Sequence, residues 1–353
     1  MKEIKLLLLG IFIGIIIYII FKYCLKIFEK FTKNTSWNSD CGNVSGLLEK
    51  VFKKRKIINS DNYDIWIPCS YDDCEEDIIK FEKFKNHKYI GIVEGCDIIA
   101  SKMALWDILR NPDLMPQSWL LNNKNDMNDF KNNYNNNKMY ILKNFAQRQE
   151  GLKLTRDYNE IINAKNNGFY LVQEYWLNPY IISGRKVNLR YYLIILVKNG
   201  VKSAFIFDDG FMYYTPKLYD PESMDFDKHV TTGYIDRKVY DENPLTQYDF
   251  RKHIGNKSTL WDNNVKTLFN KTAKIFMNKL GENTKLNQHT RFQIFGCDVQ
   301  PDENLKPKLI EINKGPDLDS KDIRDGAVKT NLLENTMKMV LDNIITPHMI
   351  KIY

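Results

Sequence analysis

Two carboxylates and an amide occupy positions from which they could hold a metal ion. Segment 306–315, KPKLIEINKG, alternates like a half-buried strand, so Glu311 and Asn313 share one face. A second strand pattern covers 292–300, FQIFGCDVQ, and the turn-forming residues PDENLKP separate the two. Folded as an antiparallel hairpin, the strands place Asp298 opposite Glu311, where two acids repel unless a cation lies between them. Such oxygens hold Mg²⁺ against phosphates, whereas a lone E-x-N is more often the wet face of an edge strand.

Basic residues on two further strands could bind those phosphates. Lys186, Asn188 and Arg190 share a face at the start of KVNLRYYLIILV, a strand apolar enough to be buried, so cations there favour a cleft over a solvent face. Lys143 ends an earlier strand just before QRQEG, a turn whose free amides suit a polyphosphate. The sequence has no Walker A or G-x-G-x-x-G pattern, so the prediction rests on the combination of residues. This combination indicates a nucleotide–Mg²⁺ site and not a nucleic-acid groove.

The composition is that of a globular protein with a basic excess. The 353 residues are 43% hydrophobic, which is enough for one large or two to three small subdomains. A net charge of +7 suits nucleic acid, a membrane surface or an acidic polypeptide equally well. The six cysteines contain no C-x-x-C pair and have no nearby His at zinc spacing. They therefore indicate reduced thiols in a cytosolic environment.

The first 25 residues predict a membrane anchor. Residues 6–21, LLLLGIFIGIIIYIIF, carry no charge, and Lys5 and Lys22 can extend this run toward the roughly 20 residues that span a bilayer. A cleaved signal peptide would need a small-residue site, and a buried core helix rarely has lysines at both ends. Lysines that follow the run place the remaining chain in the cytosol. We therefore expect a single-pass anchor at 4–25, a juxtamembrane linker at 26–60 and a cytosolic domain at 61–353.

The elements that must position the polar residues are strands and helices in mixed order. Strands are expected at 88–93, 139–145, 168–176 and 186–200, and helices at 98–111, 257–281 and 327–346. The asparagine-rich stretch 122–138 is expected to be a surface loop without chemistry. This mixture indicates an α+β fold and not a doubly wound sheet.

The same segments resemble the signatures of the tubulin tyrosine ligase-like proteins, a branch of the ATP-grasp ligases. YLVQEYWLNPYIISGRKVNLRYYLIILVKNG is similar to their central signature, and FQIFGCDVQPDENLKPKLIEINKGPDL to their C-terminal metal-binding signature. SKMALWDILRNPDLMPQSW resembles their first lysine helix, and HVTTGYIDRK their H-L-T-N segment. The resemblance covers roughly residues 88–345 in the correct order. It implies an ATP-grasp fold, in which three subdomains surround a nucleotide cleft.

The resemblance also implies a role for individual positions. The residues that would bind ATP are Lys102, Lys143, Arg148, Gly151, Gln173, Glu174, Tyr175, Trp176, Lys186 and Asn188. Arg190 would lie near the γ-phosphate, and Thr231 and Thr232 fall in the part that holds the incoming amino acid. The three magnesium ligands would be Asp298, Glu311 and Asn313.

The activity implied by the resemblance is ATP-dependent amide formation. A protein carboxylate attacks the γ-phosphate to give an acyl phosphate, and the amine of a free amino acid then displaces the phosphate. ATP and Mg²⁺ are the implied cofactors, and the family's usual acceptor is a tubulin tail, whose acidity would attract a basic protein. The added amino acid could be glutamate, glycine or tyrosine. We expect a monomer that binds no nucleic acid.

Four positions depart from the family pattern. An aspartate that contacts the nucleoside is replaced by Asn188, a hinge lysine by Glu174, and an asparagine of H-L-T-N by Thr232. The arginine expected after the D-G turn is replaced by Tyr213, for which Lys217 is the nearest substitute cation, although it lacks a guanidinium fork. These departures leave two alternatives open. One is a degenerate member that binds nucleotide or an acidic partner without catalysis, and the other is a ligase for a different substrate class.

Overall fold

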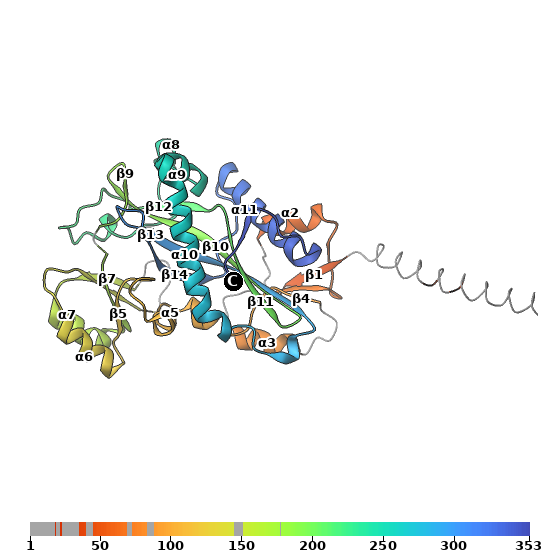
Figure 1. Cartoon of the computed structure of the whole chain (residues 1–353), viewed down its shortest axis with the longest axis horizontal. Helices are drawn as coiled ribbons and strands as arrows, with labels where there is room; N and C mark the ends of the chain where they lie inside the picture. Colours follow the sequence, from red (N-terminus) through yellow and green to blue (C-terminus); the bar gives the residue numbers. More distant parts are fainter. Residues whose placement is uncertain are drawn as a thin grey trace, which may run out of the picture.

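The structure is a computed structural model that describes Tyr18, Lys22 and residues 35–39, 45–68, 73–82, 88–144, 151–176 and 178–353. These residues form a large mixed sheet with helices on its faces, and a smaller antiparallel sheet that lies beside it (Figure 1). Parallel and antiparallel pairs occur together in the large sheet, and helices and strands follow one another irregularly. This arrangement confirms the prediction of an α+β fold.

The centre of the large sheet is the strand β10 (Arg185–Lys198). It pairs antiparallel with β11 (Val201–Phe207) and β12 (Phe211–Tyr214) on one side and with β13 (Thr290–Pro301) on the other, and β13 pairs with β14 (Pro307–Lys314). Consecutive side chains in the middle of β10, Leu193, Ile194 and Ile195, are all fully buried, so both faces of the strand are covered. The helix α10 (Ser258–Phe276) covers one of these faces (Figure 1).

The predicted juxtamembrane linker is folded where the structure describes it, and this part of the domain prediction is wrong. Its described residues include β1 (Ser36–Ser39), α2 (Gly46–Lys54) and β2 (Ile58–Asn59). The strands β3 (Ile65–Ile67) and β4 (Tyr89–Ile90) join them to the large sheet in parallel. Apolar residues at helical spacing, Leu47, Leu48, Val51 and Phe52, are buried against α11 (Ile323–Met337). This apolar face folds the segment although its charged residues gave it the appearance of a linker.

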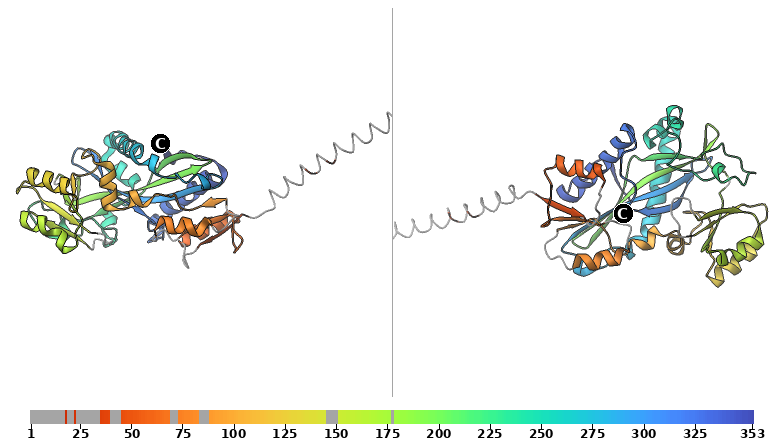
Figure 2. Two further views of the ribbon diagram at one scale, coloured as in Figure 1. Left: turned by 90° about the horizontal axis from the view of Figure 1, so that it is seen from below. Right: turned by 180° about the vertical axis from the view of Figure 1, so that it is seen from behind.

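The smaller sheet consists of β5 (Ser118–Leu120), β8 (Leu171–Glu174), β6 (Tyr140–Lys143) and β7 (Leu152–Thr155), in that order. Two helices, α6 (Lys124–Asn133) and α7 (Tyr158–Asn163), accompany it in all three views (Figures 1 and 2). The helix α6 corrects the prediction of a loop at 122–138. Asn123 caps it through the backbone amides of Asn125 and Asp126, and Phe130 is fully buried in an aromatic cluster. The many asparagines indicated a loop, but the Asn123 cap and the buried Phe130 are enough to form a helix here.

The remaining predicted elements agree in type with the structure and differ in their bounds. The predicted helix at 98–111 is split by Ser101 into α4 (Asp97–Ala100) and α5 (Lys102–Leu109), since Ser101 adopts an extended conformation and caps α5. On α10, Leu260 is exposed, whereas its neighbour Trp261 is fully buried. The other elements are α3 (Cys74–Glu82), β9 (Ile181–Ile182), α8 (Val239–Glu242), α9 (Gln247–Ile254), β15 (Met349–Lys351) and a π-helical turn (Lys338–Asp342) that continues α11.

The predicted membrane anchor at 4–25 lies outside the described residues, apart from Tyr18 and Lys22. Among the residues that are described, no helix has both the length and the apolar character needed to cross a bilayer. The prediction of a single-pass membrane location is corrected on this finding. The uncharged run of sixteen residues in the sequence is also shorter than the roughly 20 residues that a spanning helix needs.

Candidate active site

The hairpin of β13 and β14 brings the predicted metal ligands to one face. Asp298 and Glu311 are Cα partners across the ladder, as the sequence pattern predicted, and a bulge follows between Asp298 and Val299. The amide nitrogen Nδ2 of Asn313 donates a hydrogen bond of 2.9 Å to Oε1 of Glu311. This bond orients the amide so that its oxygen stays available next to two carboxylates. Bulges of this kind commonly re-aim side chains at functional sites.

The two carboxylates have different electrostatic surroundings. Burial raises the pKa of Asp298 to about 6, and the nearby Glu311 adds to this rise while Arg190 opposes it. Burial also acts to raise the pKa of Glu311, but the hydrogen bond from Asn313 and the charges of Lys102, Lys143 and Arg190 outweigh it, and the pKa is lowered. Glu311 is therefore ionised near neutral pH, in a surrounding that contains cations from three different elements.

The donor set suits a hard cation that also binds phosphate. Over the described ranges, no group of three or more His, Cys, Asp or Glu side chains is arranged to hold a metal ion. The predicted set has only two carboxylates and one amide oxygen, so it would leave several coordination positions to other oxygens. Mg²⁺ is typically bound in this manner, by one or two carboxylates together with substrate phosphates and water.

Two buried lysines lie close to one another at this site, and one of them, Lys143, is near Glu311. Lys143 ends β6 of the smaller sheet, and Lys186 lies near the start of β10 of the large sheet. Burial lowers the pKa of Lys143 to about 8, with Lys102 acting in the same direction and Glu311 against it. Burial lowers the pKa of Lys186 to about 7, and the charge of Lys143 lowers it further. Each lysine would be stabilised in its charged form by an anion, because burial without sufficient negative charge is what lowers the two pKa values.

Lys186 belongs to a chain of hydrogen bonds that the sequence did not reveal. Its ammonium donates to the hydroxyl of Tyr175 at 3.0 Å. The Nδ1 atom of His229 lies 3.1 Å from the same hydroxyl, and its Nε2 lies 2.7 Å from the backbone oxygen of Ser223. Since a carbonyl only accepts, Nε2 carries the proton and Nδ1 accepts from Tyr175. Burial lowers the pKa of His229, which agrees with a neutral imidazole in this position.

Asn188 carries an unused acceptor at the centre of this region. Its Oδ1 atom is buried and has no hydrogen-bond partner in the described part of the chain. Leaving a buried acceptor unpaired costs about 1–3 kcal/mol, so an unpaired acceptor of this kind indicates a place where a ligand could donate a hydrogen bond. The position is the one that the resemblance assigns to a nucleoside contact. The atom therefore fits a hydroxyl or amino donor of a bound nucleotide.

The predicted adenine hinge begins in β8, which ends at Glu174, and is held by side-chain contacts. Gln173 donates through Nε2 to Oγ of Ser118 at 2.8 Å, and Glu174 forms an ion pair with Lys138. The ammonium of Lys308 lies 4.7 Å from the centroid of the Trp176 ring. These contacts fix the orientation of the hinge.

The predicted phosphate loop is only partly described. Gly151 has a φ of +81°, and its backbone oxygen accepts a hydrogen bond of 2.9 Å from the amide of Asn144. A side chain there would be strained and would overlap Asn144. Arg148 lies outside the described residues, so its predicted phosphate contact stays a prediction.

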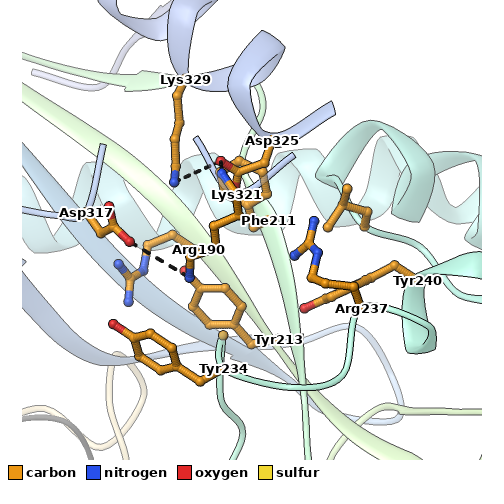
Figure 3. Close-up of a pocket in the computed structure, with 12 residues that line it drawn as sticks. Arg190, Phe211, Tyr213, Tyr234, Arg237, Tyr240, Asp317, Lys321, Asp325 and Lys329 are labelled. Carbon is orange, nitrogen blue, oxygen red and sulfur yellow. Dashed lines mark hydrogen bonds and ion pairs between the residues drawn. The ribbon is translucent and has the colours of Figure 1, made fainter. Parts of the chain in front are cut away.

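A cavity of about 120 Å³ lies beside the predicted catalytic residue Arg190 (Figure 3). The Nε atom of Arg190 is 2.6 Å from Oδ1 of Asp298, and its guanidinium lies 5.2 Å from the ring centroid of Tyr213. A Cβ atom on Gly296 would approach Nη1 of Arg190 to 2.8 Å, so this glycine leaves the space that the guanidinium occupies. Burial acts to lower the pKa of Arg190, but the carboxylate of Asp298 raises it well above its ordinary value. Arg190 is therefore a fixed, permanently charged group in the wall of the cavity.

The structure separates Lys217 from this cavity. Its ammonium is 2.8 Å from Asp225 and 3.3 Å from Asp227, and its side chain is 53% exposed. Tyr213 lines the cavity, and burial raises the pKa of its hydroxyl to about 12, against the effect of Arg190. Lys217 is not among the residues that line the cavity. Its predicted role as a replacement for the missing arginine stays untested and has no support from this geometry.

The predicted substrate residues Thr231 and Thr232 adjoin the cavity without lining it. Thr232 forms an isolated bridge with Tyr214, and its hydroxyl accepts from the amide of Tyr234 at 3.0 Å. The turn therefore places Gly233 and Tyr234 in the cavity wall. The basic residues of this wall that sequence reasoning missed are Arg237, Lys321 and Lys329. Arg237 lies in a turn, Lys321 just before α11 and Lys329 within α11, where no strand alternation could indicate a shared face.

Comparison with known proteins identifies the family. A family model described as the tubulin-tyrosine ligase family matches residues 73–349. A probable tubulin polyglutamylase of Rattus norvegicus is 31% identical over 180 residues, which cover 48% of this chain and 38% of that protein.

Two more distant relatives show the range of functions. A probable tubulin polyglutamylase of Caenorhabditis elegans is 27% identical over 256 residues, covering 67% of this chain and 60% of that protein. A Homo sapiens protein named an inactive polyglycylase is 26% identical over 243 residues, which cover 60% of this chain and 36% of that protein. The chain thus spans less than two thirds of the length of each of these relatives. Because the family match covers most of the chain, from the end of the N-terminal strands to the last strand, the chain belongs to the tubulin-tyrosine ligase family.

Proposed function

We propose that this protein is an ATP-dependent ligase that joins an amino acid to a protein carboxylate, with a tubulin tail as acceptor. The observation that carries this proposal is that Asp298 pairs with Arg190 of β10 on one side and lies opposite Glu311 on the other, where Asn313 donates to Glu311. The buried Lys143 of the smaller sheet lies near Glu311, and the buried Lys186 of β10 lies near Lys143. The fold would then be an ATP-grasp fold, with the nucleotide held between the two sheets. Family membership and the relatives named as tubulin polyglutamylases support the same proposal.

The residues around the hairpin would bind and orient the nucleotide. Lys102, Lys143 and Lys186 neutralise the phosphate oxygens, and the burial of Lys143 and Lys186 makes their attraction stronger than it would be in water. Oδ1 of Asn188 accepts from the nucleoside, and Gln173 to Trp176 frame the base. Asp298, Glu311 and Asn313 would hold Mg²⁺, which supplies charge neutralisation at the transferred phosphoryl group. Such transfer depends mainly on positioning and on electrostatic stabilisation.

Arg190 would serve the reaction itself. In the first step an oxygen of the acceptor carboxylate bonds to the γ-phosphorus, and the bond to ADP breaks. In the second step the ammonium of the amino acid first loses a proton, the resulting amine bonds to the acyl carbon, phosphate leaves and the nitrogen loses a second proton. Arg190 lies between the hairpin and the cavity, so its guanidinium can stabilise negative charge on the phosphoryl oxygens in both steps.

The proposal is tested by incubating the full chain with tubulin, ATP, Mg²⁺ and one radiolabelled amino acid at a time. We expect ATP-dependent labelling of tubulin with glutamate or glycine, and its loss in the variant Glu311→Gln. That variant should keep the fold, because the position already contains a polar group bonded to Asn313. No labelling with glutamate, glycine or tyrosine, from a protein that binds ATP, would contradict the proposal.

A second candidate is a degenerate family member that binds nucleotide without ligation. Two observations favour it: Tyr213 lies in the cavity where the family arginine is expected, and one human relative is named an inactive polyglycylase. The same assay distinguishes the two candidates, because a degenerate member would show ATP binding without transfer of label.

A further inference from the structure

Four cationic side chains line the cavity beside Arg190: Arg190 itself, Arg237, Lys321 and Lys329. Three of them have close carboxylate partners. Arg190 is held by Asp298 at 2.6 Å. Lys329 is 3.0 Å from Asp325 and donates to the backbone oxygen of Asp319 at 2.6 Å. Arg237 forms an ion pair with Asp322 and lies 4.7 Å from the ring centroid of Tyr240. The charges of these three cations are therefore already balanced by carboxylates of the protein.

Lys321 differs from these three cations. The nearest carboxylate oxygen, Oδ2 of Asp317, is 3.8 Å from its ammonium, which is beyond hydrogen-bond distance. Its other contact is the face of the Tyr234 ring, whose centroid is 4.5 Å away. Figure 3 shows Lys321 and Asp317 pointing toward one another across the cavity. Lys321 and Asp317 therefore form only a long ion pair, and their opposite charges both face the cavity.

The surroundings favour a ligand that brings a negative charge to Lys321. Burial lowers the pKa of Lys321, and Lys329 and Arg237 lower it further, against the effects of Asp317 and Asp325. Oδ1 of Asp317 accepts from the backbone amide of Asp319 at 2.9 Å, so this carboxylate is fixed in a turn while Oδ2 faces the cavity. One fixed carboxylate and one adaptable lysine suit a molecule that carries both charges on adjacent atoms.

We propose that Lys321 and Asp317 bind the free amino acid as a zwitterion, with the α-carboxylate on Lys321 and the α-ammonium on Asp317. The zwitterion would replace one long ion pair by two short ones without changing the net charge of the cavity. The cavity has the volume of about four waters, which suits a small amino acid. This inference rests on the proposed function and makes Lys321 the cation that compensates for Tyr213.

The test compares four variants of the full chain in the tubulin ligation assay with glutamate, and then with glycine. Lys321→Ala should raise KM for the amino acid by about tenfold or more, while kcat and ATP affinity change by about twofold or less, because a ground-state contact is lost. Lys321→Arg should recover most of the affinity. The matched control Lys266→Ala removes an exposed lysine on α10 and should change neither parameter.

A charge-swapped variant separates substrate binding from a structural role. Lys321→Asp combined with Asp317→Lys keeps an ion pair in the turn but reverses its polarity. If the pair serves only the fold, the swap should restore the wild-type KM. If the pair binds the zwitterion, the swap should leave KM as high as in Lys321→Ala. A restored KM, or an unchanged KM in Lys321→Ala, would overturn the inference.

Calorimetry keeps the inference separate from the proposed function. Wild-type protein with a non-hydrolysable ATP analogue and Mg²⁺ is titrated with glutamate and with glycine. Binding that disappears in Lys321→Ala supports the inference even if no ligation is detected, in which case the ligase proposal alone fails. Absence of binding of either amino acid to the wild type, under conditions in which the analogue binds, contradicts the inference.

Discussion

At the scale of single residues, the two buried lysines, Lys143 and Lys186, should take up protons when a nucleotide binds. In the free protein the pKa of Lys186 is about 7 and that of Lys143 about 8, because both are buried and lie near other cations. A bound polyphosphate favours their charged forms and raises both values. At pH 8, where Lys186 is mostly neutral and Lys143 about half protonated, binding should therefore take up protons. At pH 6 both lysines are already charged and the uptake should be small.

Calorimetry of ATP–Mg²⁺ binding at pH 8 in two buffers with different ionisation enthalpies measures this uptake. Lys186→Met should remove most of it, whereas Lys266→Met on the exposed side of α10 should not. Equal heats in the two buffers at pH 8 would show that neither lysine changes protonation on binding.

Asn188 offers a second test at this scale, because its buried Oδ1 has no partner in the described residues. Replacing it by an apolar residue of similar size removes an unsatisfied acceptor. Asn188→Leu should therefore leave the thermal midpoint of the free protein unchanged or raise it. The same variant should weaken ATP binding by about tenfold, or roughly 1.4 kcal/mol, because the nucleoside contact is lost. A lower midpoint together with unchanged ATP affinity would mean that Asn188 serves the fold.

Much of the site could be predicted where residues alternate along strands. The pairing of Asp298 with Glu311 and the shared face of Glu311 and Asn313 follow from the two-residue period and a short turn. His229 and Lys321 could not be predicted in this way. His229 lies in a turn, and only the tertiary fold brings it to Tyr175, which is 54 residues away in the sequence. Lys321 lies four residues after Asp317, in a turn that has no strand alternation to indicate a shared face.

At the scale of elements, the helix α2 belongs to the folded domain and should contribute measurably to its free energy of unfolding. Phe52 is fully buried between α2 and α11, and Ser45 caps α2 and donates to the backbone oxygen of Leu318. Phe52→Ala should lower the free energy of unfolding by about 3–5 kcal/mol, because it leaves a cavity in that contact. Urea unfolding followed by tryptophan fluorescence measures the change.

The matched control for this variant is Lys54→Ala on the same helix. Lys54 forms an ion pair with Glu334 but is 71% exposed, so its loss should cost less than about 1 kcal/mol. Equal, small losses in both variants would indicate that α2 does not contribute to the stability of the domain.

The elements that were predicted wrongly have a common physical cause. The helices α2 and α6 lie in segments dominated by Lys or Asn, and composition suggested a linker and a loop. In each helix a few buried residues and one cap determine the structure: Phe52 with Ser45, and Phe130 with Asn123. The long strands β10 and β13 were predicted correctly, because their apolar patterns extend over many residues. Average composition therefore misleads where a short helix relies on few anchors.

At the scale of the whole molecule, residues from both sheets contribute to one chemical site. The large sheet provides Arg190, Asp298 and Glu311, and the smaller sheet provides Lys143. Their charges influence one another's pKa values across the two sheets. The net charge of +7 would attract an acidic tail toward this site. Labelling of tubulin by the protein should accordingly become slower as the salt concentration rises, because screening shortens the range of this attraction.

The measurement that tests the account most directly follows oxygen from the acceptor into phosphate. A tubulin-tail peptide whose carboxylates contain ¹⁸O is incubated with the full chain, ATP, Mg²⁺ and glutamate, and then with glycine. If a carboxylate attacks the γ-phosphorus, each ligation transfers one ¹⁸O atom to the released phosphate, which mass spectrometry detects. The account predicts equal amounts of ligated peptide and ¹⁸O-phosphate with at least one of the two amino acids, and neither product in Glu311→Gln. ATP binding without ligated peptide and without ¹⁸O-phosphate in the wild type would contradict the account and establish a nucleotide-binding protein without ligase activity.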